Sequence, residues 1–149
     1  MKKIAIVILS CILALTMIGA VACGGGGKAD TVQIFERIVA EQTISKYITD
    51  GTDGLVSQYD RIEYYYSGNA GKAYKTFYNI VMVYETEAQA TTRFNALKST
   101  YGDDVKLMGR GVYVNHTDET AVDKSKSELE SELTAKGYVL VPEKEEESK

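Results

Sequence analysis

The stretch YKTFYNIVMVY, residues 74–84, is the most apolar run of the chain after its first 22 residues. Side chains of a β-strand point alternately to opposite faces of a sheet, so this run has two apolar faces. One face would carry Tyr78, Ile80, Met82 and Tyr84, and the other Phe77, Val81 and Val83. The pattern predicts a central strand that is covered on both faces, or one whose second face is an exposed aromatic patch.

Three runs upstream of this strand predict an antiparallel three-strand meander. Residues 32–39 alternate as a strand does, residues 42–48 form a short second run, and residues 55–66 form a long third run. Asp50-Gly51-Thr52-Asp53-Gly54 separates the last two runs with residues that favour a turn. Residues 67–71 then break the chain before the central strand.

A helix is predicted directly after the central strand. Thr86 has the residue type of an N-cap, and Gln89 stands three positions later, which is the spacing of a capping box. Gly102 is expected to end this helix, because glycine readily adopts the left-handed conformation that follows a helix. Its apolar stripe has helical spacing and consists of Ala90, Phe94, Leu97 and Tyr101.

A strand pair and a second helix are predicted in the last third of the chain. Residues 105–107 and 112–115 form two strands or one bent strand, and the glycines around Arg110 favour a hairpin. The second helix is predicted from about Val122 or Ser125 to Lys136, and Ser125 and Glu128 have the same capping-box spacing. Residues 138–141 are expected to fold back as a short strand.

This order of elements predicts an α+β domain. Its antiparallel sheet would consist of the three-strand meander followed by a strand–helix–hairpin–helix unit, with two helices packed on the sheet. We place this single domain at residues 31–141. A signal peptide at 1–22 and a flexible glycine-rich tether at 23–30 precede it, and a charged, disordered tail at 142–149 follows.

The first 23 residues have the order of a secretory signal. Lys2 and Lys3 give a cationic start, the apolar run Ile4–Ile18 follows, and the small residues of Gly19–Ala22 precede Cys23. A cysteine at this point resembles a bacterial lipoprotein signal, in which Cys23 receives a diacylglyceryl group and becomes the mature N-terminus. The predicted location is therefore the extracytoplasmic face of the cell membrane, with a lipid anchor.

Two other interpretations of this segment stay open. Ala20 stands where a lipoprotein signal usually has leucine, and Ala20-Val21-Ala22 is also an Ala-x-Ala site, at which signal peptidase would release a soluble protein. Ile4–Cys23 also approaches the ~20 residues that span a bilayer, as in an uncleaved anchor. The glycines at 24–27 favour the lipoprotein, because they supply a tether directly after Cys23.

Charge and cysteine content limit the function classes. The formal net charge is −4, and it becomes more negative when Lys2 and Lys3 leave with the signal, so no nucleic-acid partner is expected. The two cysteines are Cys11, inside the signal, and Cys23. No disulfide can therefore form within the mature chain, and a buried core must stabilise the fold.

No motif predicts a catalytic, cofactor or metal site. His116 is the single histidine, and its position after Val112–Val114 predicts a solvated turn residue at a strand end. One histidine without a cysteine cluster also makes a zinc site unexpected. Asp50–Gly54 lacks the ligand spacing of a calcium loop, and Gly109-Arg110-Gly111 is too short for a phosphate loop. We interpret the glycosylation-like sequence Asn115-His116-Thr117 as coincidence.

The tyrosines are the one feature with binding potential. On a sheet face they would stack on sugars or contact a peptide, and the alternative is that they form core and cross-strand pairs. The predicted function is therefore that of a non-catalytic membrane lipoprotein that binds an envelope protein or a small ligand. The alternative is a small envelope hydrolase that uses a carboxylate pair. The tyrosines in question are Tyr59, Tyr64, Tyr65, Tyr66, Tyr78 and Tyr84.

Several short motifs and the element order resemble the YehR-like family of small bacterial lipoproteins. The points of likeness are Phe35-Glu36-Arg37 in an opening strand, Gln42-Thr43 at the start of a second, a Thr-Asp-Gly turn, and Lys136-Gly137-Tyr138 after the last helix. The resemblance covers Cys23–Val141. It implies a fold and a location only, because that family has no established catalytic or binding residues to carry over.

Overall fold

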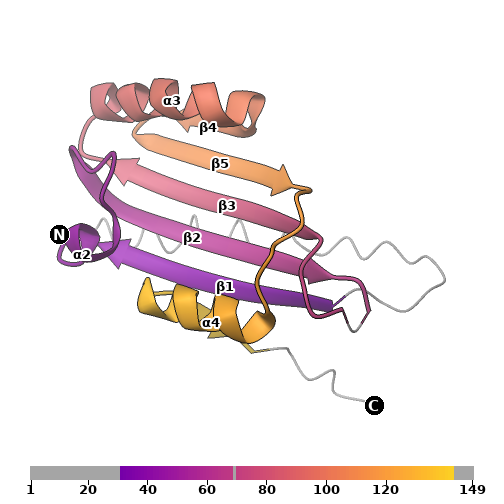
Figure 1. The fold of residues 1–149 in the computed structure, drawn as a ribbon. Coiled ribbons are helices and arrows are strands. Elements are labelled where there is room, and N and C mark those ends of the chain that lie inside the picture. Colours follow the sequence, from indigo (N-terminus) through magenta and orange to yellow (C-terminus); the bar gives the residue numbers. More distant parts are fainter. Residues whose placement is uncertain (1–30, 69, 143–149) are drawn as a thin grey trace, which may run out of the picture.

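The computed structural model describes residues 31–68 and 70–142 and shows an α+β fold (Figure 1). The predicted signal peptide, Cys23, the tether and the tail after Pro142 lie outside the described residues. The elements in chain order are β1 (Thr31–Ala40), α2 (Ile44–Tyr47), β2 (Leu55–Tyr66), β3 (Lys75–Tyr84), α3 (Glu87–Tyr101), the 3-10 turn η1 (Gly102–Asp104), β4 (Val105–Met108), β5 (Gly111–Asp118), α4 (Lys126–Ala135) and β6 (Val139–Val141).

The strands form one six-stranded antiparallel sheet in the order β4-β5-β3-β2-β1-β6. β3, the stretch with which the sequence analysis began, lies between β2 and β5 near the middle (Figure 1). β4 and β5 are joined by a turn at Gly109 and Arg110. β6, the last strand in the sequence, pairs with the first strand, β1, on the side that does not face β2. The short strands β4 and β6 form the two edges of the sheet.

The prediction of a strand at residues 42–48 is wrong. This segment is a turn followed by the single helical turn α2, and β1 pairs directly with β2. Thr43 closes the turn by donating its backbone N–H to the carbonyl oxygen of Ala40, at 2.8 Å. The helical turn places Ile44 in the hydrophobic core. A run of seven residues is too short for periodicity to separate a strand from a helical turn.

Both predicted capping boxes are confirmed. Thr86 Oγ1 accepts the backbone N–H of Gln89, and the side chain of Gln89 accepts the backbone N–H of Thr86. Ser125 and Glu128 make the same reciprocal pair at the start of α4. These bonds satisfy backbone donors that a helix start leaves without a partner, which fixes where α3 and α4 begin.

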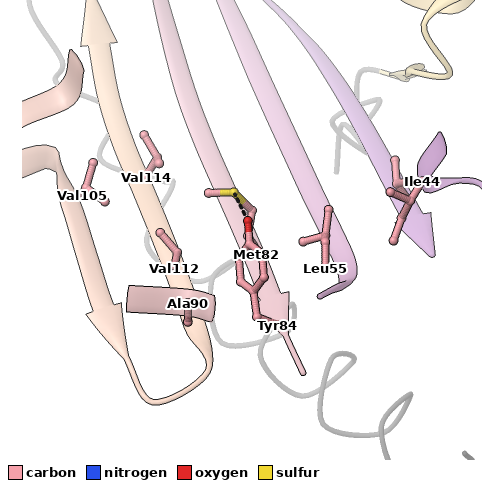
Figure 2. Close-up of a cluster of buried hydrophobic side chains, with 9 residues drawn as sticks. Ile44, Leu55, Met82, Tyr84, Ala90, Val105, Val112 and Val114 are labelled. Atoms are coloured by element: carbon pink, nitrogen blue, oxygen red, sulfur yellow. Dashed lines mark hydrogen bonds between the residues drawn. The ribbon is translucent and has the colours of Figure 1, made fainter. Parts of the chain in front are cut away.

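Two hydrophobic clusters lie side by side on one face of the sheet. Along β3, Tyr78 contacts the second cluster while Met82 and Tyr84 belong to the first, and all three share one face. The first cluster lies under α3 (Figure 2) and consists of Val39, Ile44, Leu55, Met82, Tyr84, Ala90, Val105, Val112 and Val114. The second lies under α4 and consists of Phe35, Ile62, Tyr64, Tyr66, Ala73, Leu129, Leu133 and Tyr138.

The helices therefore cover one face of the sheet. The buried helical residues Ile44, Ala90, Leu129 and Leu133 all belong to these two clusters, and within residues 31–68 and 70–142 no helix packs on the opposite face. We call the opposite face the uncovered face because no described helix packs on it, although Tyr59, Glu63 and Val81 on this face are buried. Among the described residues, the members of both clusters lie between Phe35 and Tyr138, so residues 28–149 contain all of them and serve for the experiments below.

Candidate functional site

A row of polar side chains crosses four strands of the uncovered face. Glu36 of β1 stands opposite Arg61 of β2, Arg61 opposite Asn79 of β3, and Asn79 opposite Asn115 of β5. Neighbouring strands lie about 4.8 Å apart, so the four positions form one line perpendicular to the strands. We call these residues the polar row.

Arg61 organises the part of the polar row that lies on β1 and β2. Its Nη1 donates to Glu36 Oε1 at 2.8 Å, and its Nε donates to Glu63 Oε1 at 2.9 Å. Tyr59 Oη donates to Glu36 Oε1 at 3.0 Å, and Tyr65 Oη donates to Glu63 Oε2 at 2.5 Å. Tyr59, Arg61, Glu63 and Tyr65 meet in this way because alternate residues of β2 share one face.

The network raises the pKa values of its two phenols and of its guanidinium. Burial, followed by the charge and hydrogen bond of Glu36, raises the pKa of Tyr59 to about 12. Burial and the hydrogen bond to Glu63 also raise the pKa of Tyr65. Burial alone would lower the pKa of Arg61, but the hydrogen bond and the charge of Glu63 raise it above its usual value. At neutral pH the network therefore has a charged guanidinium and two neutral phenols.

Aromatic side chains lie on both sides of the polar row. Tyr59 and Tyr113 belong to the neighbouring cross-strand line on one side, and Phe77 belongs to the line on the other. The ring of Tyr113 lies against Gly111, where a Cβ atom would come within 2.9 Å of Tyr113 Oη. Glycine at position 111 therefore leaves space for this ring on the uncovered face.

The edge of the uncovered face at β1 and β6 is apolar and accessible. Ile38 is 65% exposed and Val139 is 69% exposed, and Val139 stands opposite Glu36 in the register. Soluble proteins usually keep large aliphatic side chains at least partly buried, although single exposed ones are common. Here both lie next to one end of the polar row.

The structure divides the predicted tyrosine group between the two faces. Tyr59 and Tyr65 lie on the uncovered face, within the network of Arg61. The others, Tyr64, Tyr66, Tyr78 and Tyr84, lie on the face that the helices cover and pack in the two clusters. Sequence reasoning missed the polar row and Tyr113, because the strand register that aligns them is not visible in one sequence.

A buried ion pair lies on the helix-covered face. Asp60 is 1% exposed, and its Oδ2 accepts from Arg37 Nε at 2.8 Å and from Nη2 at 2.7 Å. Gln58 Nε2 donates to the second carboxylate oxygen at 2.8 Å. Arg37 also donates to the carbonyl oxygen of Lys136 at 3.0 Å and stacks on the Tyr138 ring at 4.3 Å. Because both oxygens of Asp60 are occupied, the pair has a structural role.

The prediction that His116 is a solvated turn residue is wrong. β5 continues past it to Asp118, because His116 pairs in register with Tyr78 of β3. Its half-buried ring stacks on Tyr78, with 6.4 Å between the ring centroids, and meets Tyr101 edge-on at 5.1 Å. Nδ1 lies 2.8 Å from Asp104 Oδ2. His116 therefore joins β5 to the end of α3 and to η1.

The glycine-containing loops act as turns. Gly51 and Gly54 have φ angles of 67° and 72°, and the carbonyl oxygen of Gly51 accepts from Tyr84 Oη at 2.9 Å. Arg93 of α3 reaches across to Asp50 at 3.2 Å. In the part of the chain that the structure describes, no three His, Cys, Asp or Glu residues are grouped so that they could hold a metal ion.

No protein-family model, no curated protein and no solved structure matches the chain. The resemblance to YehR-like lipoproteins therefore stays a prediction. None of the helices within residues 31–68 and 70–142 has the length and apolar character needed to cross a membrane.

Proposed function

We propose that this protein is a bacterial lipoprotein, anchored through Cys23 on the extracytoplasmic face of the cell membrane, that binds a partner without catalysing a reaction. The uncovered face of the sheet is the proposed contact surface. The partner is an envelope protein or a small ligand that reaches this face from the extracytoplasmic side.

The sequence at the N-terminus supports the anchor. Lys2 and Lys3, the apolar run and the small residues before Cys23 together fit a lipoprotein signal. β1 begins at Thr31, so a fully extended tether of residues 23–30 reaches at most roughly 29 Å, at about 3.6 Å per residue. A lipid at Cys23 would thus keep the domain close to the bilayer.

The polar row is the observation that carries the binding proposal. A carboxylate, a guanidinium and two amides offer both hydrogen-bond donors and acceptors in one line across Glu36, Arg61, Asn79 and Asn115. The partly exposed rings of Phe77 and Tyr113 flank this line, and such rings add stacking area next to directional polar groups. Aromatic residues and arginine are enriched at protein binding surfaces.

One observation bears on the rival proposal of a carboxylate-pair hydrolase. Glu36 and the buried Glu63, which is 7% exposed, are two carboxylates on the uncovered face, and such an enzyme would require a carboxylate pair. Both, however, accept hydrogen bonds from the same guanidinium of Arg61. Tyr59 and Tyr65 donate to the same two carboxylates, so each carboxylate is already engaged inside the network. The shared arginine therefore favours binding over hydrolysis.

A capture experiment tests the contact surface. Residues 28–149 would be immobilised and exposed to detergent-solubilised envelope extract, beside Asn115→Arg on the uncovered face and Asn95→Arg on α3. Both asparagines are exposed, so the substitutions are matched in size and charge. We expect the same retained species with wild type and Asn95→Arg, and its loss with Asn115→Arg. Equal retention by all three would contradict the proposed surface.

A turnover assay tests the non-catalytic part of the proposal. Residues 28–149, together with His116→Ala and Glu63→Gln, would be incubated with peptidoglycan, glycan polymers and ester substrates. We expect no product above the blank. Product that disappears in Glu63→Gln would establish the carboxylate-pair hydrolase, and product that disappears in His116→Ala would show a catalytic role for the histidine.

A further inference from the structure

A pocket of about 260 Å³ opens at one end of the sheet, away from the polar row. Four elements meet there, namely the start of β1, the end of β2, the start of α4 and the end of β6. Much of its lining is apolar and comes from Val32, Leu140, Val141 and Pro142. Tyr66 and Lys126 also line the pocket.

Tyr66 gives the pocket a rigid wall. Its side chain is fully buried and belongs to the second hydrophobic cluster. Its hydroxyl donates to Gln33 Oε1 at 2.9 Å, so the polar end of the ring already has a partner. The buried ring supports the pocket from the core side, with Lys126 lying over it.

Lys126 places one positive charge at this wall. Its Nζ lies 4.5 Å from the centroid of the Tyr66 ring, which holds the ammonium group beside the pocket. Among the ion pairs of the described residues, none involves Lys126. A cation–π contact attracts an ammonium group but does not neutralise its charge, so Lys126 can still pair with an anion.

The pocket combines an apolar lining with a cation that has no ion-pair partner among the described residues, and this combination selects a particular kind of ligand. An alkyl chain gains free energy by leaving water for the apolar wall, and an anionic headgroup gains by pairing with the ammonium group. A polar sugar would leave its hydroxyl groups without partners against the apolar residues, whereas a neutral hydrocarbon would not use Lys126.

We propose that this pocket binds a single-chain anionic amphiphile. The carboxylate or phosphate of the ligand pairs with Lys126, and the first part of its alkyl chain lies against Val32, Leu140 and Val141. The volume is slightly below the usual range of ligand pockets, about 300–1,000 Å³, so the far end of a long chain stays outside. This site does not include the polar row, and it does not depend on lipidation of Cys23.

The position of the pocket allows two sources for such a ligand. Thr31 and Val32 line it, and they are the first residues of β1, directly after the predicted tether. The pocket therefore lies at the end of the sheet that an anchored chain would hold near the bilayer. The amphiphile would be a free fatty acid or a chain of an anionic lipid that protrudes from the membrane.

Binding of decanoate, below its micelle concentration, tests the chemistry. ¹⁵N-labelled residues 28–149 would be titrated, with decan-1-ol as the uncharged ligand of equal chain length. We expect amide shifts at Val32, Tyr66 and Leu140, and weaker binding of the alcohol. Lys126→Gln should weaken decanoate binding about 3- to 10-fold and remove the preference over the alcohol, while the exposed control Lys106→Gln should change neither.

A second variant tests the apolar wall. Val141→Trp, on the half-buried edge strand β6, should fill the pocket and reduce binding of both ligands, and its ¹⁵N spectrum would report whether the fold is intact. Absence of shifts at the pocket at millimolar decanoate, or equal dissociation constants for wild type and Lys126→Gln, would overturn the proposal.

Vesicles distinguish the two sources. The same protein would be sedimented with vesicles of phosphatidylcholine alone and with vesicles that contain 30% phosphatidylglycerol, at about 0.15 M salt. Co-sedimentation that requires phosphatidylglycerol and Lys126 would assign the ligand to the bilayer. Decanoate binding without such co-sedimentation would assign it to a free amphiphile. If the protein binds neither decanoate nor the vesicles, both sources of the ligand are refuted.

Discussion

Arg37 and Asp60 face each other across β1 and β2 at the point where one hydrophobic cluster ends and the other begins. Phe35, two residues before Arg37, belongs to the cluster under α4, and Val39, two residues after it, belongs to the cluster under α3. The guanidinium also holds the carbonyl oxygen of Lys136 at the end of α4. The ion pair thus joins the parts of the core that the two helices cover.

Removal of one partner of this pair should destabilise the protein strongly. Arg37→Met leaves the Asp60 carboxylate buried without its counter-charge, and such changes cost about 3–5 kcal/mol. The double variant Arg37→Met/Asp60→Leu should recover much of this free energy of unfolding, because it leaves no unpaired charge. Urea denaturation measures the free energy of unfolding of the single and the double variant. A loss below about 1 kcal/mol in the single variant would mean that the pair is not buried as described.

The sequence predicted those features of the fold that depend on local chemistry. Thr86 and Ser125 begin helices because a capping box needs only residues three positions apart, and the alternation in residues 74–84 marks β3 correctly. The segment 42–48 could not be predicted, because the burial of Ile44 against distant strands decides its conformation. Short apolar runs carry too little periodic signal for that decision.

The candidate site could be predicted only in part. Tyr64, Tyr65 and Tyr66 looked equivalent, but alternation along β2 places Tyr65 on the uncovered face and its neighbours in the core. The polar row joins Glu36 and Asn115, which are close only because four strands align in register. Sequence spacing contains no record of that register.

The two helices should differ in how much they contribute to stability. Leu133 is buried under α4, so Leu133→Ala should lower the free energy of unfolding by about 2–5 kcal/mol. Phe94 of α3 is only half-buried at the edge of its cluster, and Lys98 lies over its ring. Phe94→Ala should therefore cost less, about 2 kcal/mol, although the side chain is larger. Thermal and urea unfolding measure the loss of stability in each variant. A larger loss for Phe94→Ala than for Leu133→Ala would contradict the packing described.

Alkaline pH should destabilise the fold through its tyrosines. The pKa of Tyr59 is raised to about 12 in the folded protein, chiefly by burial, whereas an exposed tyrosine ionises near 10. Its contribution to stability is therefore complete below pH 10 and is lost as the pH rises from 10 to 12, because the unfolded chain releases the proton first. Absorbance at 295 nm measures how much phenolate has formed. Urea unfolding at each pH measures the free energy of unfolding.

Tyr59→Phe should make this loss of stability between pH 10 and 12 smaller. Tyr47 is half-buried near α2, outside the network of Arg61, so Tyr47→Phe serves as the control. A stability profile that is flat across this pH range in the wild type would contradict the raised pKa of Tyr59.

Lipidation should depend on Cys23 alone. Full-length protein expressed in its bacterial host is expected to have a mature N-terminus at Cys23 whose mass includes a diacylglyceryl group, and Cys23→Ala should remain unprocessed. Two acyl chains give stable membrane association, so the wild type should stay with the membrane after a high-salt wash. An unmodified mature N-terminus after Ala22 would show an ordinary secreted protein instead.

Photo-crosslinking in living cells tests the central claim, that the uncovered face is the binding surface. A photoreactive phenylalanine analogue would be placed at position 115, within the polar row, or at position 95 on the exposed side of α3, in otherwise full-length protein. Illumination should give a defined adduct, detected by mass spectrometry, from position 115 and not from position 95. An adduct from position 95 alone, or the same products from both positions, would contradict the proposed surface.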